Sequence, residues 1–281
     1  MQRVFYFIDR GATRTVVTIV TQSLRLNRKI KIIIEYDGFR YHGWQLQSNG
    51  ITVQEVLQDC LYKITKQKTT VIASGRTDSG VHAEAQAAHF QTASRMTCHE
   101  FLMAFNSLLP YDIVVQSVEE VSPEFHAQTS ATRKIYRYTV LNRKYPSALE
   151  YNRCLFVQTP LDIKAMRRAK AHLIGRHDFS ALRASNCEAK NPVREIYKID
   201  ISKKGDFIYF HFDGNGFLKY MVRNIVGTLL EVGKKKIKPA AVKEILESKD
   251  RRRAGPTARA QGLCLVEVFY GGNEGSISQT E

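Results

Sequence analysis

The sequence predicts an α+β protein with mixed α/β units and mainly antiparallel strands. Short strand-like apolar runs alternate with helical patterns, several strands follow one another directly, and the pattern restarts near Ser122-Pro123. A length of 281 residues also favours about two domains. The expected parts are an N-terminal extension (1–28), an N-terminal α/β domain (29–122), a C-terminal α/β domain (123–271) and a tail (272–281).

The first domain is expected to contain three strands and two helices. Apolar and β-branched runs predict strands over 31–36, 70–74 and 113–121. Each helix starts with a capping box, in which a threonine and a glutamate three residues later satisfy free amides. The boxes are Thr52 with Glu55 and Thr97 with Glu100. The second helix is expected to bury Phe101, Phe105 and Leu108.

The second domain is expected to contain four strands and two helices. The strands are predicted over 133–140, 194–202, 207–212 and 264–270, the first with cations along one face. The helices are predicted over 162–174 and 217–232, the second opened by Gly214-Asn215-Gly216. Residues 176–180 are predicted to form a polar turn. The basic clusters 234–238 and 251–253 are predicted to be solvated, with contact to phosphates as the alternative.

The charge balance is strongly basic. There are 42 Lys and Arg against 27 Asp and Glu, a formal net charge of +15. Such an excess favours a polyanionic partner, because each neutralised phosphate releases condensed counterions. A generally basic, well-hydrated surface is the alternative. Nucleic acid is the favoured partner, and charge does not say which kind.

Cysteine usage and hydropathy bear on the compartment. The five cysteines lie far apart without a Cys-x-x-Cys pair, which argues against structural zinc and disulfides and favours a reducing, cytoplasmic compartment. No apolar run approaches the roughly 18 residues that a membrane span needs. Residues 1–28 lack a secretory signal pattern. A transit-like extension for organellar import, a disordered arm and an upstream start codon remain open for them.

The loop Ala73–Ala83 carries the strongest candidate for chemistry. It presents Asp78 between Gly75 and Gly80, two residues after Arg76. The glycines let the backbone turn sharply and approach a ligand closely. A carboxylate on such a turn beside a cation is suited to act as a nucleophile or acid–base group. The alternative is an Asx-turn, in which the aspartate only accepts hydrogen bonds from neighbouring amides.

Other catalytic patterns are excluded by their spacing. No Gly-Lys-Ser/Thr follows a glycine loop, no second histidine follows His99-Glu100 at the metalloprotease spacing, and no Gly-x-Ser-x-Gly elbow occurs. The eight histidines show no metal-ligand grouping, so no metal site is predicted, and structural roles are favoured for His82 and His89. A phosphohydrolase that uses Asp78 would need further acids to hold Mg²⁺, and these are lacking.

Cations interleaved with aromatic residues favour RNA. Aromatic faces stack on bases while cations hold phosphates, a combination suited to unstacked RNA. A carboxylate that attacks a nucleoside must stay ionised, which the neighbouring Arg76 favours, and the target base must leave its stack. For Tyr136 the alternative is a packed strand tyrosine. The candidate RNA contacts in the two mixed segments, 36–44 and 133–138, are Arg40, His42, Arg133 and Lys134.

Several motifs resemble, in the same order, those of one enzyme family. The stretch Gly75-Arg76-Thr77-Asp78-Ser79-Gly80-Val81-His82-Ala83 closely resembles the catalytic motif of the TruA family of tRNA pseudouridine synthases. The resemblance covers about residues 29–271. Its further motifs are Glu35-Tyr36-Asp37-Gly38, Tyr41-His42-Gly43-Trp44-Gln45, Phe125-His126-Ala127, Tyr136-Arg137-Tyr138, His177-Asp178-Phe179, Met221-Val222-Arg223-Asn224-Ile225-Val226-Gly227 and Gly262-Leu263-Cys264-Leu265.

The resemblance implies an enzyme that isomerises uridine to pseudouridine in the tRNA anticodon stem-loop, at positions 38 to 40. It implies a homodimer without metal or organic cofactor, in which two α/β domains of the pseudouridine synthase fold meet at a basic cleft. Asp78 matches the nucleophile, which attacks ribose C1′ or uracil C6. Tyr136 matches the tyrosine that packs on the base, Arg76 the arginine that helps to flip the nucleotide, and Arg223 the residue that pairs with the aspartate. A non-catalytic tRNA- or RNA-binding protein is the alternative.

The chain departs from the family pattern at two places. Many members carry an arginine directly after Phe-His-Ala, where this chain has Gln128. A cationic contact to RNA is therefore not expected from that position, and adjacent cations could compensate. Residues 1–28 resemble no part of the family.

Overall fold

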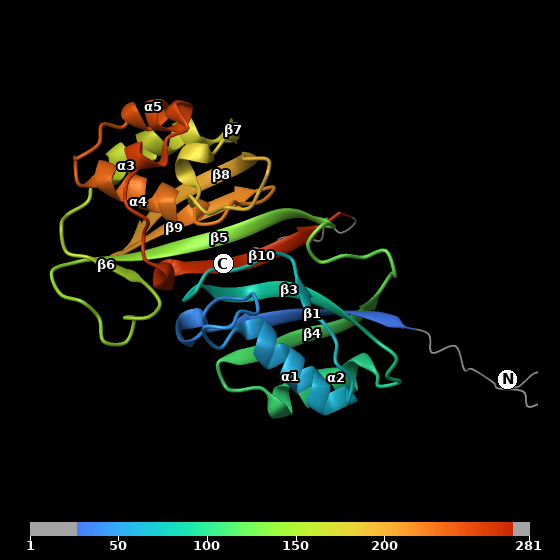
Figure 1. Ribbon diagram of the computed structural model, residues 1–281. Coiled ribbons are helices and arrows are strands. Elements are labelled where there is room, and N and C mark those ends of the chain that lie inside the picture. Colours follow the sequence, from blue (N-terminus) through green and yellow to red (C-terminus); the bar gives the residue numbers. More distant parts are fainter. Residues whose placement is uncertain (1–26, 272–281) are drawn as a thin grey trace, which may run out of the picture.

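The computed structural model describes residues 27–271, which form one mixed, mainly antiparallel sheet with helices packed on it (Figure 1). The predictions for residues 1–26 and for the tail lie outside the described residues. Within them, the strands across the sheet are β4 (Ile113–Val121), β1 (Arg28–Tyr36), β3 (His82–Thr92), β10 (Leu263–Tyr270), β5 (Ala131–Asn142), β9 (Phe207–Gly214), β8 (Val193–Lys204) and β7 (Gly175–Asp178). Two short strands, β2 (Ile72–Ala73) and β6 (Leu155–Val157), pair with β3 and β5. The predicted α+β class is confirmed.

The last strand of the chain, β10, joins the two halves of the sheet (Figure 1). It runs parallel to β3, with Cys264 opposite His82, and antiparallel to β5, with Leu265 opposite Tyr136. The loop that ends at β3 is thereby brought next to the strand that carries Tyr136. The sheet is continuous across the expected boundary near residue 122, and the division into two domains stays a prediction.

Helices α1 (Val53–Thr65) and α2 (Cys98–Leu108) pack beside the N-terminal strands (Figure 1). Both predicted capping boxes are present, with a threonine side chain accepting from the backbone amide of the glutamate in each. Phe101 and Phe105 are fully buried, but Leu108, predicted to be buried, is 47% exposed. The chain turns at Leu109, which packs against the core in its place.

Helices α3 (Ile163–Lys170), α4 (Met221–Gly233) and α5 (Ala241–Ser248) gather over β8 and β9 (Figure 1). Helix α4 is buried almost all round. Single 3₁₀ turns occur at η1 (Gly38–Arg40), η2 (Ala171–Leu173), η3 (Ser180–Leu182), η4 (Arg251–Arg253) and η5 (Ala260–Gly262). Among residues 27–271, no helix is long and apolar enough to cross a membrane.

Several element boundaries were wrong. The polar turn predicted from residue 176 is largely strand β7, whose polar residues suit a sheet edge. The helix predicted over 217–232 begins only at Met221, because Tyr220 has left-handed backbone angles (φ 63°). The α-helix predicted over 162–174 ends at Lys170, and the chain continues as the 3₁₀ turn η2. Of the strand predicted over 70–74, only Ile72 and Ala73 (β2) pair with β3. Strand β3 and the short elements β6 and α5 were not predicted.

Candidate active site

The loop Ser74–Val81 between β2 and β3 is tied to the rest of the fold at several points. The Gln86 side chain donates to the Gly75 carbonyl at 2.9 Å. The buried Thr77 hydroxyl shares a hydrogen bond with the Tyr36 hydroxyl at 2.8 Å. The Trp44 amide donates to the Thr77 carbonyl at 3.1 Å. The loop and the aromatic segment that follows β1 therefore form one rigid unit.

Two glycines allow this unit to close. Gly80 and Gly43 have positive φ angles of 77° and 87°, which L side chains rarely adopt. A Cβ added at Gly43 would lie 2.6 Å from the Thr77 carbonyl oxygen. The sequence predicted that the loop backbone approaches a ligand closely. In the structure, the loop instead approaches the backbone of the segment around Gly43.

Asp78 presents a partly buried carboxylate, with its side chain 18% exposed. Its Oδ2 accepts a hydrogen bond from Nη1 of Arg223 at 3.1 Å. Burial raises the pKa of Asp78, and the charges of Arg223 and Lys219 oppose that shift. Within residues 27–271 its side chain accepts no hydrogen bond from a neighbouring backbone amide, which disfavours the Asx-turn alternative.

Arg223 projects from the first turn of α4, and its guanidinium is held on three sides. Its Nε donates to the Ala258 carbonyl at 2.8 Å, while Nη1 reaches Asp78. Its Cζ lies 4.7 Å from the ring centroid of Tyr220, in cation–π contact. The cation beside Asp78 is thus Arg223, the residue that the family resemblance pairs with the aspartate, and not the adjacent Arg76 that the loop sequence favoured.

The loop that carries Ala258 is fastened to α4 by a polar network. Arg251 donates to the side chains of Asn224 and Thr257, each at 3.0 Å, and to the Gly255 carbonyl at 2.9 Å. Asn224 is fully buried. Arg251, expected to lie in a solvated cluster, is therefore part of the support behind Arg223.

The Arg76 side chain is well exposed and lines the cavity, and its ion pair is with a glutamate of another segment. Its Nη1 lies 3.3 Å from Oε2 of Glu188, itself 86% exposed, on the segment that follows η3. This pair links the Asp78 loop to the C-terminal half of the chain. The role in nucleotide flipping that the resemblance implies for Arg76 stays a prediction.

Tyr136 lies on β5 with only 8% of its surface exposed. The ring of Phe217 meets its ring edge to face, with centroids 5.2 Å apart. Burial raises the pKa of the Tyr136 hydroxyl far above its ordinary value, so the phenol stays neutral. A neutral, firmly packed ring at the cavity wall is suited to stack on a base.

Lys134 lies two residues from Tyr136 on the same face of β5. Its Nζ donates to the Ser74 carbonyl at 2.6 Å, at the start of the Asp78 loop. Burial, with a smaller contribution from Arg194, lowers the pKa of Lys134 to about 8. Lys134 therefore braces the loop and does not offer a free charge to solvent.

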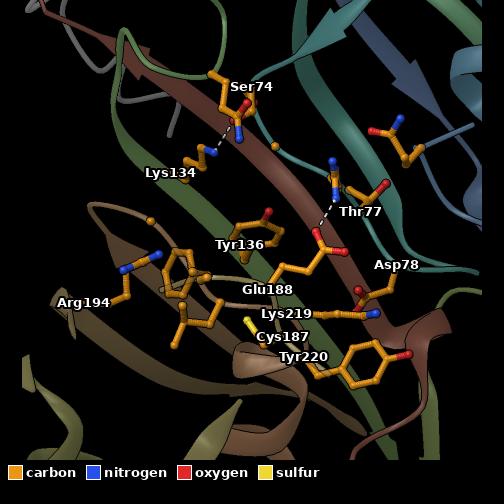
Figure 2. Close-up of a pocket in the computed structure, with 18 of the residues that line it drawn as sticks. Ser74, Thr77, Asp78, Lys134, Tyr136, Cys187, Glu188, Arg194, Lys219 and Tyr220 are labelled. Atoms are coloured by element: carbon orange, nitrogen blue, oxygen red, sulfur yellow. Dashed lines mark hydrogen bonds and ion pairs between the residues drawn. The ribbon is translucent and has the colours of Figure 1, made fainter. Parts of the chain in front are cut away.

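These residues surround a cavity of about 1040 Å³ between the two halves of the chain. In the view of Figure 2, Ser74 and Lys134 lie at one end, Asp78 and Tyr220 at the other, and Tyr136 between them. The volume would accommodate a nucleotide with its neighbours. Sequence reasoning missed some of the lining residues, which lie before or on β8 or just before α4: Cys187, Glu188, Arg194, Phe217, Lys219 and Tyr220.

The candidate RNA contacts divide between cavity and outer surface. His42 lines the cavity, as does Gln128, where the chain departs from the family pattern. Arg133 lies on the opposite face of β5 and pairs with both carboxylate oxygens of Asp213 at 2.7 Å. Arg40 also lies outside the lining and donates to the Tyr111 hydroxyl at 3.1 Å. Only His42 and Lys134 of the four thus reach the site. Arg133 and Lys134 separate because neighbouring residues of a strand face opposite sides.

The two histidines nearest the loop make structural contacts. His82 Nδ1 accepts from the Gly38 amide at 3.1 Å. His89 Nδ1 accepts from the Ala127 amide at 3.1 Å, and burial lowers the pKa of His89 to about 4. In the described part of the chain, no three His, Cys, Asp or Glu side chains gather closely enough to hold a metal ion.

Comparisons with known proteins agree with this geometry. The family model described as tRNA pseudouridine synthase matches residues 32–129 and 169–271. A protein of Thermoanaerobacter sp. (strain X514) named tRNA pseudouridine synthase A is 47% identical over 86% of this chain and 100% of its own length. Proteins of the same name from Acetivibrio thermocellus and Myxococcus xanthus are each 46% identical over 86% of this chain and over 100% and 92% of their own lengths.

Among solved structures, a Cbf5-Nop10-Gar1 complex is similar with a TM-score of 0.36, at 12% identity over 84% of this chain and 48% of that chain. That likeness carries no weight beside the sequence relatives. The family model covers well over half of the chain, and the relatives are aligned over nearly all of the described residues. The chain therefore belongs to the tRNA pseudouridine synthase family.

Proposed function

We propose that this protein isomerises uridine to pseudouridine in the anticodon stem-loop of tRNA, at positions 38 to 40, with Asp78 as nucleophile. The observation that carries the proposal is the placement of the Asp78 carboxylate on a rigid loop, 3.1 Å from Arg223 and at the wall of a cavity that Tyr136 also lines. One nucleophile, one paired cation and one aromatic platform meet there. These are the groups that attack on a flipped uridine requires.

The chemistry needs an ionised carboxylate in a half-buried place. Burial opposes ionisation of Asp78, whereas Arg223 and Lys219 favour it, so the two cations keep the nucleophile charged. Asp78 attacks either ribose C1′ or uracil C6, and both sites remain open in this proposal. In either case the N1–C1′ bond breaks, the base turns, a C1′–C5 bond forms and the bond to Asp78 breaks. The proton on C5 is then lost to solvent and N1 takes up a proton.

Binding of tRNA is supported by the excess of positive charge and by the mixture of aromatic and polar groups around the cavity. Reactivity toward an unstacked nucleotide is supported by Tyr136, whose neutral ring can replace the stacking lost in the RNA. A homodimer, which rests on the family resemblance alone, and a cytoplasmic location, which rests on cysteine usage, complete the proposal.

The test is release of tritium from tRNA labelled at uracil C5. The wild type is expected to release it, and Asp78→Asn to lose release while still binding tRNA. Asp59→Asn, an exposed change on α1, is the matched control and is expected to behave as wild type. Undiminished release by Asp78→Asn would refute the nucleophile assignment. If the protein only binds RNA, mapping of the incubated tRNA will show no new pseudouridine.

A further inference from the structure

We propose that Tyr220 is a positioning residue for catalysis, which holds the Arg223 guanidinium against the Asp78 carboxylate and is kept in a strained backbone conformation for that purpose. The inference deepens the proposed function and rests on it. It assigns a role to a residue that the family motifs quoted above do not include.

The strain at Tyr220 is unlike that at the other left-handed residues. Among residues 27–271, the non-glycine residues with positive φ are Lys66, Tyr220, Lys235 and Lys249. The three lysines lie at or just beyond helix C-termini, where left-handed residues are common. Tyr220 instead precedes the first turn of α4 and makes no side-chain capping bond. That place normally holds an extended Ser, Thr, Asp or Asn, so helix capping does not explain a tyrosine there.

The contacts of the Tyr220 ring explain why a tyrosine occupies this position. Arg223 Cζ lies 4.7 Å from the ring centroid of Tyr220, in cation–π contact. The Nζ of Lys219 lies 5.6 Å from the same centroid. The ring thus contacts both cations that act on the Asp78 carboxylate, and Figure 2 shows Asp78, Lys219 and Tyr220 at the same end of the cavity.

The guanidinium has three supports, of which Tyr220 is the only side-chain ring. The Ala258 carbonyl holds Nε at 2.8 Å and Asp78 holds Nη1 at 3.1 Å. Two hydrogen bonds leave the planar group free to rock about the line that joins them, and an aromatic face stacked on it removes that freedom. Without the ring, the mean distance from Arg223 to Asp78 should lengthen.

The consequence falls on the ionisation of Asp78. The titratable and charged groups that face this carboxylate are Arg223, Lys219 and the hydroxyl of Tyr136. Burial already raises the pKa of Asp78, so a looser Arg223 would raise that pKa further and reduce the fraction of ionised nucleophile.

The experiment compares Tyr220→Asn with Tyr220→Phe. Asparagine accepts left-handed backbone angles but has no ring, so the thermal unfolding midpoint should not fall. Its kcat for tRNA should fall about tenfold, and the acid limb of its kcat–pH profile should move to higher pH. Tyr220→Phe keeps the aromatic ring and should retain the wild-type kcat and the wild-type acid limb. The matched control is Lys66→Asn, which also places an asparagine at a left-handed position, here at the exposed end of α1. It should leave kcat and the pH profile unchanged.

Wild-type kcat and an unmoved acid limb in Tyr220→Asn would overturn the proposal, as would equal losses in the Asn and Phe variants. Titration of Asp78 followed by carbon-13 NMR gives a readout that does not depend on turnover. There, a higher pKa of Asp78 in Tyr220→Asn than in the wild type supports the positioning role, and an equal pKa overturns it. A wild type without tritium release would instead refute the proposed function, and the NMR comparison would still decide the role of Tyr220.

Discussion

Gly227→Ala should destabilise the protein and slow its reaction, although helix propensity predicts the opposite. Gly227 lies inside α4, where alanine is intrinsically preferred by about 1 kcal/mol. In the structure, a Cβ at Gly227 would overlap the carbonyl oxygen of Pro256 and lie 2.9 Å from its carbonyl carbon. A Cβ at Gly255 would likewise lie 2.7 Å from Thr228 Cα. Helix and loop therefore meet backbone to backbone, and no flexible side chain can move aside.

The magnitude follows from this contact. Carbon atoms pack at about 3.5–4.0 Å, so the distance to the Pro256 carbonyl carbon alone requires the loop to retreat by roughly 1 Å, and the overlap with the Pro256 oxygen requires more. Overpacking costs about 1–3 kcal/mol, and a contact between two backbones belongs at the upper end. Subtracting the propensity gain leaves a loss of about 2 kcal/mol, or about 4–8 °C in Tm for a chain of this size. The same loop carries the Ala258 carbonyl that holds Arg223, so kcat should fall at least about tenfold.

Thermal unfolding and tritium release measure the two effects. Gly205→Ala is the control, since no described heavy atom lies within 4 Å of its added Cβ, although its φ of 57° is positive. The left-handed backbone should cost it about 1–2 kcal/mol, and it should keep full activity, so activity is the readout that separates the two variants. A Gly227→Ala variant as stable as the wild type, or more stable, would refute the packing argument and leave helix propensity as the larger effect.

Three further perturbations test the supports of the site. The pKa of Lys134 is lowered to about 8, so Lys134 loses its proton at a lower pH in the native state than in the unfolded chain. The free energy of unfolding of the wild type, relative to that of Lys134→Met, should therefore rise between about pH 8 and 10.5. A difference that does not change with pH would contradict this. Arg251→Met should cost about 2 kcal/mol in chemical denaturation while the exposed Arg252→Met changes nothing, and equal effects would contradict the network. Glu188→Gln should free Arg76 and tighten tRNA binding at low ionic strength, with the difference vanishing at high salt; unchanged low-salt affinity would contradict this.

Local patterns predicted much of the fold. The two capping boxes started helices where expected, and the strand predicted over 113–121 matches β4 in full, because these signals depend on hydrogen bonds and periodicity within a few residues. The failures have a common cause. Leu108, strand β7 and the start of α4 at Met221 were decided by what the rest of the chain packs against them, and the local pattern does not contain that information.

The candidate site divides in the same way. The sequence alone shows that Asp78 stands on a glycine-flanked loop, that Tyr136 lies on a strand with alternating faces, and that the chain carries a large positive charge. Local reasoning placed Arg76 beside Asp78, and only the family resemblance paired Asp78 with Arg223. In the structure the cation that meets Asp78 is Arg223, 145 residues further along the chain, and not Arg76, two residues before it. A side chain on a turn points where the turn directs it, whereas residues far apart in sequence meet only when β10 joins the two halves of the sheet and α4 packs beside them.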